Sequence, residues 1–520
     1  MAEASDSVFT SELQACFNEL KKHSVSCKLG STSPTAGDEM ENPLNKQFSL
    51  ILSKIEEMLS KHEKGTEDYV KVLAMKASII YEKAKILLSE NFLASSKSFL
   101  EDALEVIEEY YENPKVAFLQ MRIINHLTYV MSRLGEFDKA KELLEKAIAD
   151  EDKCDPEVFS TDDLFLNTTK NSKISASKLN RLTLNNMQML AWIYAKLGDT
   201  EENLKMQHHI LQKQLDLGEG DVLRWVESCF RLSGLFISQQ SWKNARYHLV
   251  AAESVLNPLE ISLNPNPEIF AIQGDLARSW VYYGLQLFES SRKSASMIDI
   301  EPDRLENASA IIDNNDSEGD LLTFSRLQVD MPAVPASNIK NLEEAKTLFA
   351  FVQKWIKRGR LYYTLRDFPL QYVNLCLDLS ELYRFVSLYE EDLESQYSVQ
   401  RKRYEALETL STILKEVRPN CYVAVTIELT KEIIEVQMEM MNLNLKRLYA
   451  SDNQRPEVNE DNLKKKINVF LGANSQLQKI SDTLNSTPTC MKDRGYIQPK
   501  NNEKVEYERK NDEEKDNSST

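Results

Sequence analysis

The clearest pattern in the chain is a run of apolar positions at helical spacing that a single glycine interrupts. In HLTYVMSRLGEFDKAKELLEKAIA (126–149), apolar residues recur on one helix face, stop at Gly135 and then begin again. The small residues Ala140 and Ala147 fall where a second helix has to approach the first closely. The pattern predicts a helical hairpin of the tetratricopeptide type, which builds a groove for partners.

The same hairpin pattern recurs along the first half of the chain. It is visible at 81–109, 187–215 and 229–256, where apolar positions again keep helical spacing around a break. The second helices are anchored at Ser96, Ala140, Asn203 and Ala245. These anchors lie further apart than the ~34 residues of a regular repeat. We therefore predict an all-α fold, an irregular tetratricopeptide-like helical solenoid whose first half covers 45–296.

A second helical half is predicted at 339–486. Between Pro369 and Pro419 the chain has neither glycine nor proline, so this span is either one very long helix or a hairpin that turns without glycine. The stretch 268–296 reads as one long helix or as two. Both pairs of alternatives remain open at this point.

Three polar segments flank or separate the two halves. Residues 1–44 are expected to form an N-terminal helix followed by a flexible linker, and 297–338 an acidic linker or loop. Residues 487–520 have almost no aliphatic side chains, which predicts a disordered C-terminal tail.

Charge and cysteine content exclude some classes of partner and compartment. The net charge is −18, and most of the acidity lies in the connectors 150–163 and 299–320. With this sign and no basic stripe, nucleic-acid binding is disfavoured. The 7 cysteines are scattered and form no CxxC pair, which is typical of reduced thiols in a cytosolic protein. No apolar run is long enough to span a membrane and no secretory signal is visible, so we expect a cytoplasmic protein without membrane insertion.

The sequence contains no motif for catalysis or for a cofactor. The chain has no phosphate-binding glycine loop and no HExxH. His208 and His209 are adjacent, so their rings diverge around a helix and predict no metal site. We expect no enzyme activity, no catalytic residue, no metal and no cofactor. The basic triplet Arg401-Lys402-Arg403 is interpreted as a solvated face, with a phosphate or acidic partner as the alternative. The acids expected to pair with it are Glu390, Glu391, Asp392 and Glu394.

The chain resembles the kinesin-binding protein family over roughly 45–485. The resemblance is carried by GDLARSWVYYGLQLFESS (274–291), NLEEAKTLFAFVQKW (341–355) and LCLDLSELYRFVSLYEEDLESQYSVQRKRYEALETLSTILKEVRPNCY (375–422). It implies a two-part solenoid that binds kinesin motor domains and blocks the surface that grips the microtubule. It also implies a cytoskeleton-associated role in microtubule organisation, mitochondrial transport and axon growth. The family continues with further C-terminal helices, whereas here a polar tail follows after about 485.

The first helix of each hairpin is expected to line the concave side, which makes its polar and aromatic positions candidates for a partner-binding groove. With Gln214, which matches the family, the candidates are Arg122, Asn125, Tyr129, Arg133, Asn185, Gln188, Met189, Trp192, Glu227 and Arg231. Among them arginine outnumbers glutamate, so these residues do not support a simple acidic groove.

The expected partners are kinesin motor domains, and possible further partners are microtubule-associated or tubulin-binding proteins. The rival hypothesis is a scaffold or cargo adaptor that holds peptides or tubulin on the same solenoid without inhibiting a motor.

Overall fold

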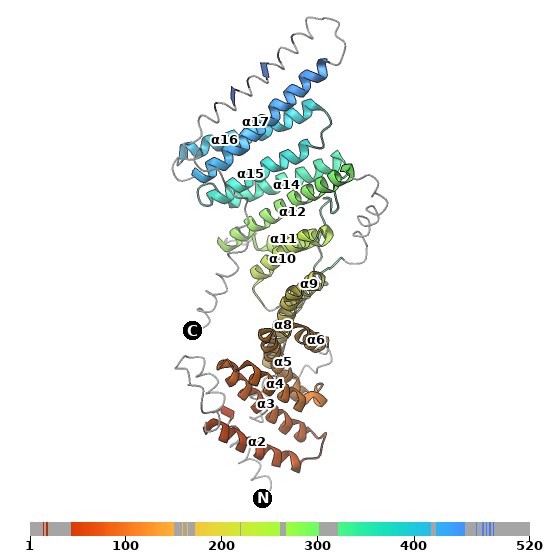
Figure 1. Ribbon diagram of the computed structural model, residues 1–520, viewed down its shortest axis with the longest axis vertical. Coiled ribbons are helices and arrows are strands. Elements are labelled where there is room, and N and C mark those ends of the chain that lie inside the picture. The colour runs from red at the N-terminus through yellow and green to blue at the C-terminus, as the bar shows by residue number, and fades with distance from the viewer. Residues whose placement is uncertain are drawn as a thin grey trace. The chain divides into compact units, whose positions relative to one another are not determined.

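The computed structural model describes residues 43–149, 172–218, 220–260, 267–300, 321–417 and 423–452, with isolated positions at 14, 17, 18, 159, 164, 464, 468, 471, 472, 475, 478, 479 and 482. Within these residues the chain forms fourteen α-helices, one 3-10 helix and no strand (Figure 1). The all-α, repeat-like prediction is therefore confirmed. The predicted flexible linker after the first helix, the two acidic connectors and the C-terminal tail fall almost wholly outside the described residues.

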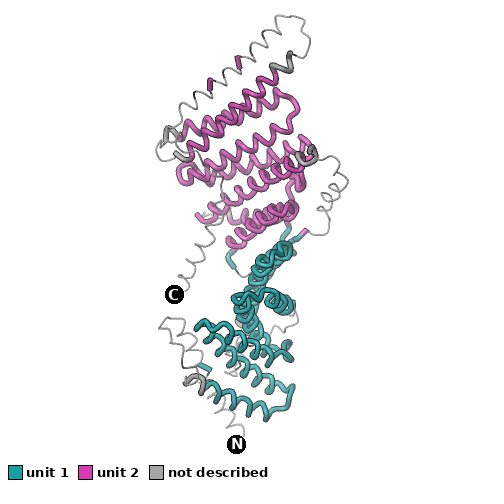
Figure 2. The backbone as a smooth tube through the Cα atoms, in the orientation of Figure 1, with its two compact units in different colours: residues 1–221, 322–328 teal, residues 222–321, 329–520 magenta. Residues whose placement is uncertain are grey.

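The described chain divides into two compact units (Figure 2). Unit 1 comprises residues 1–221 and 322–328, and unit 2 comprises 222–321 and 329–520. The division falls at a different place from the predicted connector 297–338. The physical reason is that α12 (Pro267–Ile300), on one side of that connector, packs along its length on α14 (Leu342–Tyr362), on the other side.

Unit 1 is built from helices, most of which are joined by short turns. They are α2 (Pro43–Lys61), α3 (Glu67–Ser89), α4 (Leu93–Ile107), the 3-10 helix η2 (Glu108–Tyr110), α5 (Pro114–Leu134), α6 (Phe137–Ala149), α8 (Ser172–Leu197) and α9 (Thr200–Leu217). Gly135 ends α5 with φ 81°, a left-handed conformation that favours glycine and that allows the chain to reverse into α6. The hairpin predicted from 126–149 is thus present.

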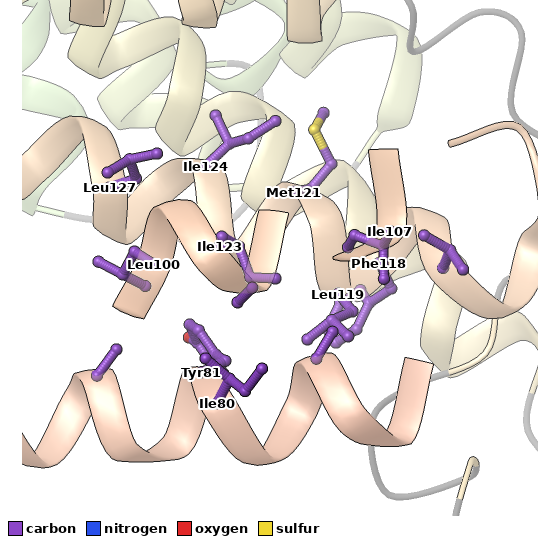
Figure 3. Packing of buried hydrophobic residues seen from close by; sticks show 14 of the residues in the cluster. Ile80, Tyr81, Leu100, Ile107, Phe118, Leu119, Met121, Ile123, Ile124 and Leu127 are labelled. Carbon is purple, nitrogen blue, oxygen red and sulfur yellow. The ribbon is translucent and has the colours of Figure 1, made fainter. Parts of the chain in front are cut away.

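The core of unit 1 is formed by the faces that these helices turn toward one another (Figure 3). Ile80 and Tyr81 of α3 lie against Leu100 of α4 and Ile123 of α5. Ser96 in α4 is fully buried and its hydroxyl donates to the backbone carbonyl of Ala84 in α3 at 2.8 Å. A small residue here lets the two helices come close enough for this hydrogen bond, as the repeat pattern predicted.

Unit 2 continues the hairpin arrangement with longer helices. They are α10 (Val222–Ser238), α11 (Trp242–Glu260), α12, α14, α15 (Pro369–Ser387), α16 (Leu393–Val417) and α17 (Val423–Asp452). The stretch 268–296 lies in one helix, α12. The glycine-free span after Pro369 is a hairpin, in which α15 and α16 are joined by a turn at 388–392. Both alternatives left open by the sequence are thereby decided.

Two glycines in the middle of helices bring the elements of unit 2 together. A Cβ atom on Gly284 of α12 would overlap the Cγ2 atom of Val352 in α14. A Cβ atom on Gly359 of α14 would lie 2.9 Å from the Cδ1 atom of Leu375 in α15. Gly284 therefore needs to be glycine for close packing, since the stiff Val352 side chain already fills the space, whereas at Gly359 the end of a flexible leucine side chain has to move aside.

The second half of the predicted connector is ordered without regular secondary structure. In unit 1, Phe324 is buried and stacks on His208, with the ring centroids 4.6 Å apart. In unit 2, the hydroxyl of Tyr283 donates to the carbonyl of Pro335 at 2.7 Å, and the amide of Ile339 donates to Ser291 at 2.9 Å. Residues 322–340 are therefore a packed segment and not a free linker.

Candidate partner-binding groove

Unit 2 carries a groove of 1330 Å³ that is formed by α10, α12, α15 and α17. These are the first helices of successive hairpins, as expected for the concave side of a helical repeat. The groove is lined by Glu227, Phe230, Arg231, Ser233, Gly234 and Ile237 of α10, by Asp275, Arg278, Ser279, Tyr282 and Leu285 of α12, by Asn374, Leu377, Asp378, Glu381 and Arg384 of α15, and by Glu428, Lys431, Glu432 and Glu435 of α17.

The lining of the groove is acidic in balance, with seven carboxylates and four cationic side chains. The two predicted residues of this unit, Glu227 and Arg231, both line it. The acids that sequence reasoning missed lie on α15 and α17. The positions of Glu428, Lys431, Glu432 and Glu435 in the sequence are typical of one helix face, but nothing in the sequence indicates that this face meets α10 and α12.

One wall of the groove is held by a buried polar network. Arg403 of α16 is fully buried, and its guanidinium donates to Glu432 at 2.9 Å and to Glu439 at 3.2 Å, both on α17. Its Nε atom donates to the hydroxyl of Ser380 in α15 at 2.7 Å. Arg403 therefore fixes α15 and α17 relative to each other, and with them the positions of the groove carboxylates.

A second arginine extends this network to the groove surface. Arg384 of α15 pairs with Glu435 at 3.2 Å and with Glu381 at 3.2 Å. The two arginines thus form ion pairs with four glutamates, which are Glu381, Glu432, Glu435 and Glu439. Burial raises the pKa of Glu381 above its ordinary value, and the nearby Arg384 opposes this shift. The wall therefore holds more negative than positive charge, which suits it to a cationic partner.

The predicted pairing of Arg401-Lys402-Arg403 with the acidic run before it is wrong. Arg401 pairs with Glu405 at 2.9 Å, on its own helix, and Arg403 points into the α15–α17 network. Glu390 of the acidic run pairs instead with Lys346, at 3.2 Å, and Glu394 pairs with Arg447. Arg403 turns inward because it lies on the face of α16 that packs against α17, where Glu432 and Glu439 supply the counter-charges.

In unit 1, Trp192 of α8 is 46% exposed and lies edge-to-face against Phe137, with the ring centroids 5.8 Å apart. Tyr129 of α5 is also exposed and accepts a hydrogen bond from Arg133 at 3.1 Å. These aromatic side chains are held in place by neighbours and still present one side to solvent. Neither residue lines the groove of unit 2, so their assignment to a partner-binding groove stays a prediction.

The other predicted residues of unit 1 differ in exposure. The amide of Asn125 donates to Asn186 at 2.8 Å, and the guanidinium of Arg122 lies 5.2 Å from the centre of the Tyr81 ring. Met189 accepts a hydrogen bond from Thr128 at 3.1 Å, so it lies between α5 and α8. Asn185 and Gln188 are exposed, and Gln214 of α9 is half-buried. Only part of the predicted set is thus open to a partner.

The part of the chain that the structure describes contains no candidate metal site and no helix that could span a membrane. No group of three or more histidine, cysteine, aspartate or glutamate side chains there could hold a metal ion. His208 stacks on Phe324, and burial lowers its pKa to about 4 with a smaller contribution from His209. None of the described helices is long and apolar enough to cross a membrane.

Comparison with known proteins gives a family for this chain. The family described as "KIF-1 binding protein C terminal" matches residues 223–475. The KIF-binding protein of Drosophila melanogaster is 24% identical over 375 residues, which cover 68% of this chain and 62% of that protein. Together these matches support the KIF-binding protein family for this chain.

Further members of the KIF-binding protein family match at similar identity. The protein of Gallus gallus is 21% identical over 462 residues, which cover 82% of this chain and 76% of that protein. The protein of Homo sapiens is 22% identical over 293 residues, which cover 52% of this chain and 47% of that protein. The chain spans about half the length of most of the curated relatives that it matches.

Solved structures add nothing to the assignment. A circular tandem repeat protein covers 92% of this chain and 99% of its own, at 12% identity and a TM-score of 0.26, which is too low to carry an argument. The family match is more informative, because the region that it covers contains every residue that lines the groove of unit 2.

Proposed function

We propose that this chain binds kinesin motor domains in the groove of unit 2 and keeps them from attaching to microtubules. The relatives are named KIF-binding proteins, which supports a binding role in place of catalysis. The process served would be microtubule-based transport and cytoskeletal organisation, including mitochondrial transport and axon growth. The chain would act in the cytoplasm, in association with the cytoskeleton.

The observation that carries this proposal is the acidic balance of a groove that lies wholly within the matched region. A microtubule surface is acidic, so the motor surface that grips it has to be complementary in charge. A groove with seven carboxylates and four cations offers that same motor surface a competing acidic partner. Inhibition then follows, because one motor surface cannot be occupied by both partners at once.

The groove also offers apolar contact area. Tyr282 of α12 is 46% exposed and lies among the lining residues with Phe230 and Leu377. Aromatic side chains in such positions commonly contribute more binding energy than their neighbours. We propose that carboxylates attract and orient the motor, and that Tyr282 contributes to holding it once docked.

The test is co-sedimentation of isolated kinesin motor domains with microtubules, at increasing concentrations of this protein. The expected result is that motors move from the pellet to the supernatant, and that added salt weakens the effect. The double variant Glu227→Lys/Glu428→Lys should raise the concentration needed for release by about tenfold. Both glutamates are half-buried and lack hydrogen-bond partners among the described residues, so the fold should tolerate the change.

The matched control is Glu391→Lys, which makes the same charge change in the exposed turn between α15 and α16. It should release motors as efficiently as the wild type. If wild-type protein releases no kinesin motor from microtubules, inhibition is ruled out. Binding of motors or tubulin without release would support the scaffold alternative.

A further inference from the structure

Besides its groove, unit 2 has a surface with exposed apolar side chains, at the edge where α14 ends and α15 begins. Leu361 in the last turn of α14 is 76% exposed, and Leu370 in the first turn of α15 is 55% exposed. Phe368, which precedes α15, and Phe270 of α12 are also exposed. We call these four residues, together with Lys354, Lys357 and Arg366, the α14–α15 edge.

The apolar residues of this edge are brought together by ring contacts. The ring centroids of Phe270 and Tyr362 lie 6.0 Å apart, and those of Tyr363 and Phe368 lie 5.6 Å apart. The end of α14 is thereby held between the start of α12 and the start of α15. Four large apolar side chains from three segments thus protrude at one place, which is uncommon on a protein surface without a binding role.

Three cations accompany these apolar side chains. Lys354 and Lys357 lie on the same exposed face of α14 as Leu361, and Arg366 lies in the turn before Phe368. None of the three has an ion pair or hydrogen bond with a described residue. The acid of this turn, Asp367, accepts a hydrogen bond from Thr364 at 2.8 Å. In a chain of net charge −18, this concentration of positive charge without a partner among the described residues is unexpected.

This edge is separate from the groove of unit 2. No residue of α14 lines that groove. The opposite face of α14, with Val352, Trp355 and Ile356, is buried in the core. The exposed face is therefore available to a different partner, and a kinesin bound in the groove does not require it.

We propose that the α14–α15 edge binds the surface of membranes that contain anionic phospholipids. Protruding leucine and phenylalanine side chains would enter the boundary between headgroups and acyl chains, where such residues insert by about 5–10 Å. A helix rises 1.5 Å per residue, so Lys357 and Lys354 lie about 6 and 10 Å behind Leu361 along α14. At that depth their ammonium groups meet the phosphate layer when Leu361 is inserted.

An acidic protein segment would also match the positive charge. Peptides, however, are usually recognised by grooves or sheet edges that enclose their side chains. Here the apolar side chains protrude, and the most exposed of them, Leu361, stands at a helix end. A flat and deformable apolar layer with negative headgroups fits this shape, so lipid is the occupant that the geometry favours.

The test is co-sedimentation of the full chain with phosphatidylcholine vesicles that either contain or lack phosphatidylserine. We expect binding to the phosphatidylserine vesicles only, and we expect it to weaken with salt. The variant Lys354→Gln/Lys357→Gln should lower the partition coefficient by about thirtyfold, the equivalent of about 1 kcal/mol for each lysine. Leu361→Ser/Leu370→Ser should also lower binding, although the charge is unchanged.

Matched controls are available in the same unit. Lys402→Gln removes an exposed lysine from α16, and Leu388→Ser removes an exposed leucine after α15. Neither should change vesicle binding. The proposal is overturned if wild-type protein does not bind phosphatidylserine vesicles, or if the control variants lose binding as much as the edge variants. It is also overturned if soluble polyglutamate binds this edge and the vesicles do not, which would identify an acidic protein site.

Discussion

Arg403 of α16 and Glu432 of α17 form an ion pair of 2.9 Å in which the arginine side chain is fully buried. The same arginine bonds Ser380 of α15 and Glu439 of α17, so one guanidinium joins three helices. Removing one partner of a buried ion pair is costly, because the charges left behind have lost both water and their counter-ion. The arrangement of the groove wall therefore depends on Arg403.

The first prediction is that Arg403→Ala destabilises unit 2 by about 3 kcal/mol. This loss of stability is at the lower end of the range expected for breaking a buried ion pair, because the glutamate partners of Arg403 are about one-third exposed. Urea unfolding followed by tryptophan fluorescence measures it, since four of the 5 tryptophans lie in unit 2. The neighbouring Lys402→Ala is the control and should change the midpoint little. Equal effects of the two variants would contradict the role assigned to Arg403.

The second prediction concerns pH. Burial raises the pKa of Glu439 above the ordinary value of 4.5, and Arg403 opposes this shift. A carboxyl whose pKa is raised by folding contributes stability at low pH, and this contribution is lost as pH rises through the folded pKa. Glu439→Gln removes this titration and keeps an acceptor for Arg403. The variant should therefore be more stable than the wild type at neutral pH and similar to it near pH 4.

Thermal melts of Glu439→Gln and wild type across this pH range provide the measurement. Glu405→Gln, in an exposed pair with Arg401, is the control and should show no such pH-dependent gain. A variant that is less stable than the wild type at neutral pH would mean that the attraction of Arg403 outweighs the burial of Glu439.

The third prediction compares two helical glycines. Gly284→Ala should destabilise unit 2 by about 1–3 kcal/mol, because its methyl group would overlap Val352 and force α12 and α14 apart. Gly234→Ala in α10 meets no atom within 4 Å and should stabilise the protein by about 0.5–1 kcal/mol through better helix propensity. Urea midpoints of the two variants should move in opposite directions. A stabilised Gly284→Ala would mean that α12 and α14 do not pack this closely.

The fourth prediction separates binding from stability at Trp192. Trp192 is nearly half exposed and lies in unit 1, outside the groove of unit 2; if it is a second motor contact, as the sequence predicted, Trp192→Ala weakens motor binding by about 2 kcal/mol or more while the melting temperature falls little. Trp280→Ala, at a fully buried position, should cost about 3–5 kcal/mol of stability. Binding is measured by motor pull-down and stability by thermal melts. If Trp192→Ala unfolds as early as Trp280→Ala, Trp192 is a packing residue and not a contact residue.

The repeat architecture could be predicted from the sequence because it depends on local patterns. Apolar spacing determines which face of each helix is buried, and Gly135 ends α5 in the left-handed conformation that reverses the chain. The small residues Ala140 and Ala245, predicted at close contacts between helices, are both fully buried. Each of these features needs information from only a few neighbouring residues.

The groove could be predicted only in part. Glu227 and Arg231 line it as expected from their place on a first helix, whereas the carboxylates of α15 and α17 that make it acidic were missed. Their contribution depends on which helices lie side by side across the unit, and helical periodicity carries no information about that.

Contacts between residues far apart in the sequence determine the features that could not be predicted. Arg401 and Arg403 look alike in the sequence, yet Arg401 pairs on the surface and Arg403 is buried among glutamates of α17. Burial of a charge is tolerable only where distant residues supply counter-charges and hydrogen bonds. Likewise, a side chain at Gly284 is disfavoured only because Val352, far along the chain, lies against it. Local apolar spacing therefore specifies the helices and their buried faces, whereas the packing of distant helices brings particular charges and glycines into contact.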